Sequence, residues 1–254
     1  MRNIALRISY DGSRYHGWQV QNSVSTVQGM LEATLTRLCG HIVKLSGCGR
    51  TDAGVHALRY CANFRTNCGI PTDRLPLAIN SLLPPDIAVL DAVEAPDRFD
   101  ANLSCVKKEY AYRIYNSRVR DPFYFDRAHF YGKTLDVDAM RRAAEHFVGT
   151  RDFASLRSAG TETRTTVRTV HWYEIDEERP FVTLRVCADG FLYNMARAMA
   201  GTLLYVSEGK ISPDEIPGLL ALKDRRLTGP TVPPGGLYLN RIWYDGPVGE
   251  MMER

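Results

Sequence analysis

The chain has 254 residues, of which 44% are hydrophobic and 24% are charged, as in an ordinary globular protein. This length allows one large domain or two modest ones, each able to bury a core. The formal net charge of +3 is mild, so a nucleic-acid partner would have to be bound through local basic clusters and not through the field of the whole chain.

The first hundred residues predict the order strand, helix, strand, strand, helix, strand. The expected strands cover residues 3–10, 41–45, 58–64 and 87–93, and the expected helices cover residues 27–38 and 73–83. Alternating apolar residues indicate the strands, and apolar residues three and four apart indicate the first helix. Ser25 and Gln28 have the spacing of a capping box at the start of that helix, and Gly40 is expected to end it.

The second part of the chain predicts a similar order, although no repeat is visible residue by residue. The expected strands are residues 107–115, 167–175, 181–186 and 237–243, and the expected helices are residues 140–147, 191–206 and a segment beginning at Ser212-Pro213. The fold class predicted is α+β, with two similar ferredoxin-like or RRM-like domains, each an antiparallel sheet backed by helices. We expect domains of residues 1–104 and 105–254, with the active-site cleft between them.

Six scattered cysteines, none in a C-x-x-C pair, argue against a secreted disulfide framework or a zinc site. The chain begins with a strand pattern interleaved with Arg2 and Arg7, so no signal peptide is expected. The most apolar predicted helix contains Asn194 and Arg197, and it is shorter than the roughly 20 residues that a membrane span needs. We therefore expect a soluble cytoplasmic protein that does not contact a membrane.

Residues 47–57 form a glycine-rich loop that presents Asp52 beside Arg50. Three glycines between two strands indicate a backbone that passes through positive φ or approaches another segment closely. Asp52 and Arg50 are therefore expected on a fixed, exposed loop, where a reactive group is more useful than a packing one.

Several chemistries do not fit this loop. Two of its glycines have the spacing of a phosphate-binding P-loop, but Val55-His56 replaces the required Lys-Ser/Thr, and a strand follows in place of a helix. The chain has neither a G-x-S-x-G nucleophile elbow nor a G-x-G-x-x-G after the first strand. Cys48, Asp52 and His56 are spaced along a turn and would not converge on one metal ion. A cofactor-free, metal-free enzyme or a binding protein remains.

Basic and aromatic residues alternate between residues 107 and 120. Five basic residues and one acidic residue give this segment a charge of +4, and Tyr110, Tyr112 and Tyr115 lie among them. Such a surface suits contacts to phosphates and stacking on unpaired bases of RNA. The alternative is an amphipathic strand whose charged face is simply solvated.

Residues 49–57, Gly-Arg-Thr-Asp-Ala-Gly-Val-His-Ala, closely resemble the signature of the tRNA pseudouridine synthase A (TruA) family. The resemblance covers nearly the whole chain and includes, in order, Tyr10-Asp11-Gly12, Gly17-Trp18-Gln19, Lys108-Glu109-Tyr110-Ala111-Tyr112, Tyr115-Asn116, Asp152-Phe153, Phe191-Leu192 and Gly236-Leu237-Tyr238-Leu239. Two departures are visible. The helix near residue 195 reads Met-Ala-Arg-Ala, with Ala196 and Ala198 where the family usually has Val and Asn, and Asn102 stands where a basic residue is common. They bear on RNA or packing contacts, not on the reaction.

The resemblance implies an enzyme that isomerises uridine to pseudouridine at positions 38, 39 and 40 in the anticodon stem-loop of tRNA. It implies a homodimer that holds a tRNA across both subunits, and Asp52 as the essential nucleophile. A carboxylate can form a covalent intermediate without a cofactor. Attack at C1′, attack at C6 and a glycal route remain open. The alternative for Asp52 is an aspartate that hydrogen-bonds its own turn.

Three substrate-binding residues are implied in the same way. Arg50 resembles the arginine that enters the RNA helix in place of the extruded base; the alternative is a surface ion pair. Tyr110 resembles a tyrosine that contacts the target base; the alternative is a core aromatic. Arg197 resembles the arginine that pairs with the catalytic aspartate and favours its charged form; packing on Asn194 or capping a carbonyl is the alternative.

A non-catalytic RNA-binding protein with the same fold is the rival to the enzyme. The intact Asp52 loop favours the enzyme, because binding alone does not need a carboxylate directed at an anionic backbone.

Overall fold

The computed structural model describes residues 1–160 and 163–254. Packing divides the chain into an N-terminal unit, formed by residues 1–108 with 238–254, and a central unit, formed by residues 109–237. Each unit is a mixed α/β assembly in which a sheet is backed by helices. The domain boundary expected near Ser104 stays a prediction. The packing units differ from it in the C-terminal segment, which joins the N-terminal unit.

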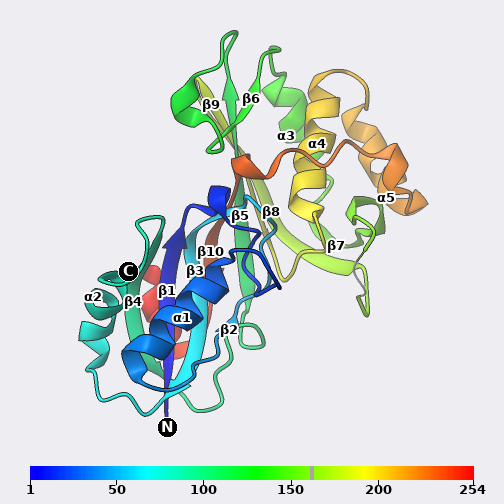
Figure 1. The fold of residues 1–254 in the computed structure, drawn as a ribbon. Coiled ribbons are helices and arrows are strands. Elements are labelled where there is room, and N and C mark those ends of the chain that lie inside the picture. Colours follow the sequence, from blue (N-terminus) through cyan, green and yellow to red (C-terminus); the bar gives the residue numbers. More distant parts are fainter. Residues whose placement is uncertain (161–162) are drawn as a thin grey trace. The chain divides into compact units, whose positions relative to one another are not determined.

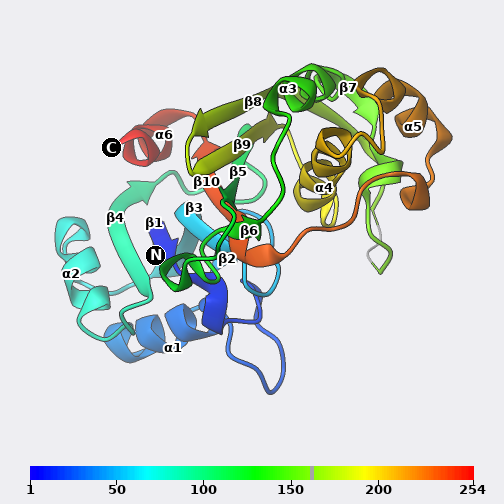
Figure 2. The same ribbon diagram turned by 90° about the horizontal axis from the view of Figure 1, so that it is seen from above.

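The N-terminal unit is built on strands in the order β4, β1, β3, β10. Its elements are β1 (Arg2–Tyr10), α1 (Val27–Cys39), β2 (Ser46–Gly47), β3 (His56–Thr66), α2 (Leu75–Asn80), β4 (Ile87–Ala95), β10 (Leu237–Trp243) and α6 (Gly246–Glu253) (Figure 1). β1 is antiparallel to both β3 and β4, but β10 joins β3 in parallel, so the expectation of a wholly antiparallel sheet is wrong here. Helices α1 and α2 cover one face of these strands and α6 the other (Figure 2).

The N-cap of helix α1 lies one residue later than predicted. Thr26, and not Ser25, is the N-cap, and its hydroxyl accepts a hydrogen bond from the Gly29 amide at 3.3 Å. Gly40 ends the helix with a φ of +72°, as predicted, because glycine adopts this conformation without a steric penalty.

The strand predicted at residues 41–45 is absent from this described part of the chain, and only the two-residue β2 follows it. Side chains of α1 replace the ladder bonds that a strand would have made. The Val43 amide donates to the Thr36 hydroxyl at 3.0 Å, and the Leu45 amide donates to the Glu32 carboxylate at 3.0 Å. Val43 and Leu45 are buried, but the segment does not pair as a strand, so the prediction of a strand here is wrong.

The central unit is built on strands in the order β5, β9, β8, β7. Its elements are β5 (Lys107–Asn116, in this unit from Glu109), β6 (His129–Tyr131), α3 (Val137–Glu145), β7 (Gly149–Asp152), β8 (Val167–Glu178), β9 (Phe181–Ala188), α4 (Met195–Ser207) and α5 (Ile216–Leu222). β6 pairs with β5 in parallel. α3 packs on α4 and on β8 (Figure 1). α4 begins later than predicted because Asn194, at its N-cap, is left-handed with a φ of +62°.

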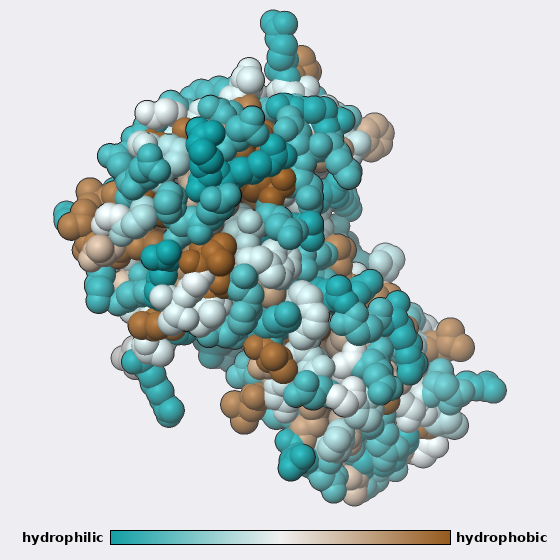
Figure 3. Space-filling view, turned by 180° about the vertical axis from the view of Figure 1, so that it is seen from behind, coloured by the Kyte–Doolittle hydropathy of each residue, from teal (hydrophilic) through white to brown (hydrophobic). Residues whose placement is uncertain are grey.

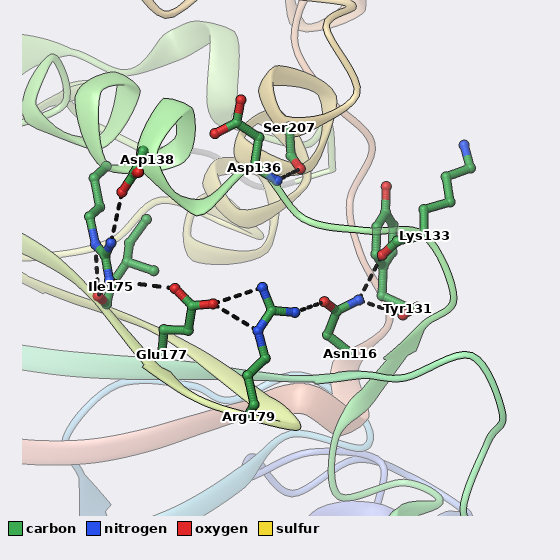
Figure 4. Close-up of polar contacts among 10 residues, drawn as sticks. Asn116, Tyr131, Lys133, Asp136, Asp138, Ile175, Glu177, Arg179 and Ser207 are labelled. Atoms are coloured by element: carbon green, nitrogen blue, oxygen red, sulfur yellow. Dashed lines mark hydrogen bonds and ion pairs between the residues drawn. The ribbon is translucent and has the colours of Figure 1, made fainter.

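Polar side chains join the C-terminal end of β5 to the turn between β8 and β9 (Figure 4). The Arg179 guanidinium donates to the Glu177 carboxylate at 2.7 Å and to the Asn116 side-chain oxygen. The Asn116 amide donates to the backbone oxygens of Tyr131 and Lys133, at 2.8 and 2.7 Å. Asn116, one of the residues that carry the family resemblance, therefore has a structural role at this edge.

One face of the molecule is largely hydrophilic, with hydrophobic residues gathered in separate small areas (Figure 3). Among the residues that the structure describes, none of the helices has both the length and the hydropathy required to cross a membrane.

Candidate active site

The loop that carries Asp52 lies in the N-terminal unit between β2 and β3. The Asp52 side chain is half-buried and Arg50 is exposed. Gly49 and Gly54 have φ values of +87° and +77°, which confirms the positive φ expected from the glycine pattern. At Gly47 a Cβ atom would lie 2.5 Å from the Tyr60 hydroxyl, so the close approach expected of these glycines is also present.

Backbone hydrogen bonds join this loop to the segment that follows β1. The Trp18 amide donates to the Thr51 carbonyl at 3.1 Å, and the Gly54 amide donates to the Tyr15 carbonyl at 3.2 Å. Within the loop, the Val55 amide donates to the Asp52 carbonyl at 3.1 Å. The backbone of the candidate nucleophile is thus bounded by hydrogen bonds on both sides.

Two glycines of the same segment allow it to approach the loop. A Cβ atom on Gly12 would lie 1.9 Å from the Val55 carbonyl oxygen, and one on Gly17 would lie 2.3 Å from the Thr51 carbonyl oxygen. Both distances are far below a van der Waals contact, so any side chain at either position must displace the loop. Gly12 and Gly17 were recognised in the sequence as part of the family resemblance, but their role in positioning the loop was not.

A hydrogen bond between two buried side chains connects the loop to the end of β1. The Thr51 hydroxyl and the Tyr10 hydroxyl are 2.8 Å apart, and both residues are buried. Burial raises the pKa of Tyr10, which therefore stays protonated and able to hydrogen-bond. A buried hydroxyl pair of this kind is costly to leave unsatisfied, so it favours one loop conformation.

His56 ends the loop and is a structural residue in this arrangement. Its Nδ1 atom accepts a hydrogen bond from the Gly12 amide at 3.1 Å, and its ring stacks on Tyr238 with centroids 4.6 Å apart. This stack joins β10 to the start of β3. Across residues 1–160 and 163–254, no group of three or more His, Cys, Asp or Glu side chains is arranged to hold a metal ion.

An open hollow of about 440 Å³ lies beside Arg50 in the same unit. Trp18, Gln19, Asn102 and Leu103 are among its lining residues. Asn102, the departure from the family pattern, is exposed at this hollow, so it stands where an RNA contact is possible. By contrast Ala196 and Ala198, the departures in α4, are both buried and bear on packing.

The other two candidate residues belong to the central unit. Tyr110, on β5, is half-buried and meets the Phe191 ring edge-on, with centroids 4.9 Å apart and planes at 82°. Arg197, on α4, donates from Nε to the Val232 carbonyl and from Nη1 to the Asn194 side-chain oxygen, both at 2.8 Å. The contacts considered as the alternative for Arg197 are therefore present, and its pairing with the catalytic aspartate stays a prediction.

Comparison with known proteins identifies the family. The family described as tRNA pseudouridine synthase matches residues 7–102 and 143–245. A tRNA pseudouridine synthase A of Caldicellulosiruptor bescii is 49% identical over 96% of this chain and 100% of its own length. Proteins of the same name from Caldicellulosiruptor saccharolyticus and Geotalea uraniireducens are each 44% identical, again over 96% of this chain and 100% of theirs. The chain therefore belongs to the tRNA pseudouridine synthase family.

Proposed function

We propose that this protein isomerises uridine to pseudouridine at positions 38, 39 and 40 in the anticodon stem-loop of tRNA, with Asp52 as the nucleophile. The observation that carries the proposal is a half-buried carboxylate on a loop whose backbone is hydrogen-bonded on both sides, in a chain of this family. The isomerisation breaks the N1–C1′ bond, rotates the base and rejoins it through C5. A fixed carboxylate can catalyse these steps without a cofactor, because covalent catalysis needs only a positioned nucleophile.

Arg50 supports the proposal through its exposure. A base inside a stem must leave the stack before it reaches a side chain in the protein, at a cost of a few kcal/mol. Arg50 extends from the same loop as Asp52, two residues away, and it lines the open hollow. We assign it to the space that the extruded base vacates.

We assign Tyr110 to contact with the target base and Arg197 to the Asp52 carboxylate. The Phe191 ring holds Tyr110 edge-on, and the Val232 and Asn194 oxygens fix the Arg197 guanidinium, so both side chains are oriented before substrate binds. We also propose a cytoplasmic homodimer. A binding groove built from two chains would be consistent with the mild net charge of +3 on each chain.

Release of tritium from tRNA labelled at C5 of uridine tests the reaction, because the rearrangement replaces the C5 hydrogen. We expect release by the wild type and none by Asp52→Ala, with tRNA binding retained in both. Asp73→Ala is a suitable control, because that side chain is 80% exposed and lies in a different segment of the same unit. Release that survives Asp52→Ala would remove Asp52 from the mechanism. Wild type that binds tRNA without releasing tritium would support the rival, a non-catalytic RNA-binding protein.

Arg50→Ala tests base extrusion separately from binding. A fluorescent base beside the target uridine reports unstacking, while filter retention reports the affinity for tRNA. We expect the variant to lose extrusion more than affinity, since Arg50 is assigned to the vacated stack. Arg226→Ala, at a side chain that is 88% exposed in the central unit, controls for the loss of one positive charge. Equal losses of extrusion and affinity would make Arg50 a phosphate contact only.

A further inference from the structure

Residues 228–233 form an irregular segment that packs against α4 in the central unit, drawn in orange in Figure 1. A Cβ atom on Gly201 of α4 would lie 1.8 Å from the Pro230 carbonyl oxygen, and one on Gly229 would lie 2.2 Å from the Gly201 carbonyl oxygen. A side chain at either position would therefore push the two backbones apart. The Gly229 amide also donates to the buried Thr202 hydroxyl at 3.0 Å. The path of the segment is thus fixed where it meets α4.

The half-buried Arg225 side chain holds this segment in place. Its Nη1 atom donates to the Thr228 hydroxyl at 2.8 Å and to the Gly229 carbonyl at 2.6 Å, and its Nη2 atom donates to the Thr231 hydroxyl at 2.9 Å. The Thr228 hydroxyl in turn donates to the Ser155 carbonyl at 3.0 Å. Because the guanidinium is a rigid planar fork, its three hydrogen bonds fix the positions of the three residues relative to one another.

The C-terminal end of the segment supplies a hydrogen-bond acceptor to Arg197. The carbonyl of the buried Val232 accepts the Arg197 Nε–H at 2.8 Å. Val232 directly follows Thr231, the last residue of the segment to which Arg225 donates. The position of the Val232 carbonyl, and with it the direction of the Arg197 guanidinium, therefore depends on the hydrogen bonds that Arg225 makes.

A second contact orients the same guanidinium from the N-terminal end of α4. The Asn194 side-chain oxygen accepts the Arg197 Nη1–H at 2.8 Å, and the Asn194 side-chain nitrogen donates to the Ser158 hydroxyl at 3.0 Å. Arg197 thus donates to a backbone carbonyl through one nitrogen and to a side chain through another. The two contacts fix the plane of the guanidinium only while both acceptors keep their places, so the loss of either is expected to let it turn.

We propose that Arg225 is a positioning residue for Arg197 and acts through residues 228–233. The inference rests on the proposed function, in which Arg197 is assigned to the Asp52 carboxylate. Without the Arg225 guanidinium the segment loses three hydrogen bonds on the side that leads to Val232, and the Arg197 Nε–H loses its fixed acceptor. A displacement of about 1 Å in a group that stabilises charge can lower the rate on the order of 100-fold.

Solvent exchange of the Arg197 Hε proton tests this coupling without reference to activity. Nuclear magnetic resonance follows the proton in the full chain with isotopically labelled arginine, and Arg197→Lys identifies its resonance by the loss of the signal. We expect slow exchange in the wild type, because the proton is bonded to the buried Val232 carbonyl, and exchange on the order of tenfold faster in Arg225→Met. Arg226→Met removes a neighbouring charge that is 88% exposed and paired with Asp224, so it should leave the exchange unchanged.

Thr231→Val is a milder variant that applies even where Arg225→Met does not fold. It keeps the shape of the side chain and removes only the hydrogen bond from Arg225 Nη2. We expect exchange of the Arg197 Hε proton to become faster than in the wild type, by a smaller factor than in Arg225→Met. Exchange that stays at the wild-type rate in the folded variants would overturn the coupling.

Tritium release with the protein in excess over tRNA separates a positioning role from a merely structural one. We expect Arg225→Met to lower the maximal rate by about 10- to 100-fold and to leave the half-saturating protein concentration within about twofold, because the displaced group acts after tRNA has bound. In an Arg197→Met background the same substitution should cause no further loss, since no guanidinium remains to be positioned.

A loss by the same factor in both backgrounds would make Arg225 a structural residue and overturn the proposal. An unchanged maximal rate with weaker tRNA binding would overturn it as well, because Arg225 would then be an RNA contact. An unchanged rate in Arg197→Met alone would count against the role of Arg197 in the proposed function, while the exchange result would stand by itself.

Discussion

Gly17→Ala tests whether the segment after β1 positions Asp52. Gly17 has a φ of +82°, and an added Cβ would lie 2.3 Å from the Thr51 carbonyl oxygen and 3.1 Å from the Asp52 carbonyl carbon. Both are backbone atoms, so no side-chain rotation can relieve the contact. The loop and the segment must separate, and the hydrogen bond from the Trp18 amide to Thr51 is then strained or lost.

The expected cost has two parts. An alanine in the left-handed region costs about 1–2 kcal/mol, and one lost hydrogen bond costs about 1 kcal/mol, so the free energy of unfolding should fall by about 2–3 kcal/mol. The effect on turnover should be larger than this loss implies. A misplacement of about 1 Å in a reacting group can cost on the order of 100-fold in rate, and here the displaced atoms adjoin the nucleophile itself.

Gly40→Ala is the matched control. Gly40 has a φ of +72°, but among the described residues there is no atom within 4 Å of the position that its Cβ would take. It should therefore show the backbone cost without the clash, and tritium release should be unchanged. Urea unfolding measures the stability of both variants. Our account of the loop would be refuted if Gly17→Ala resembled Gly40→Ala in both stability and turnover.

Two further substitutions test interactions that support the fold. Thr51→Val removes the partner of the buried Tyr10 hydroxyl, and urea unfolding should show a loss of about 1–3 kcal/mol; a loss well below this range would mean that the hydroxyl finds another partner. Lys210 and neighbouring groups lower the pKa of Glu208 from 4.5 to about 2, so this carboxylate stabilises the fold fully above pH 4.5 and loses that contribution as the pH falls through 2. The stability difference between wild type and Glu208→Gln should therefore be present at pH 7 and shrink between pH 4.5 and 2, and a difference that does not change with pH would contradict this assignment.

Local patterns predicted the structure well where neighbouring residues decide it. Gly49 and Gly54 of the Asp52 loop have the positive φ values that the glycine pattern indicated, and Gly40 ends α1 as expected. The helical segment expected to begin at Ser212-Pro213 is also present, with Ser212 at the N-cap and Pro213 in the first turn. In each case a backbone conformation or a hydrogen bond between adjacent residues is encoded within a few positions of the sequence.

Features that depend on distant partners were not predicted. The segment at residues 41–45 is not a strand, because Thr36 and Glu32 on the preceding helix satisfy its amides. β10 packs with the N-terminal unit because it pairs with β3 across more than 180 residues of sequence, and no local pattern records that pairing. The role of Gly12 and Gly17 was missed for the same reason. Each position must be glycine because a Cβ atom there would collide with a backbone carbonyl of another segment.

The most direct test of the central claim is a map of pseudouridine in an unmodified tRNA transcript after incubation with the purified protein. Carbodiimide labelling followed by primer extension locates each pseudouridine by the position at which the extension stops. The account predicts stops at positions 38, 39 or 40, wherever the transcript has uridine, with wild type and none with Asp52→Asn. Stops elsewhere in the transcript would contradict the proposed substrate, and stops that persist with Asp52→Asn would contradict the assignment of Asp52 as the nucleophile.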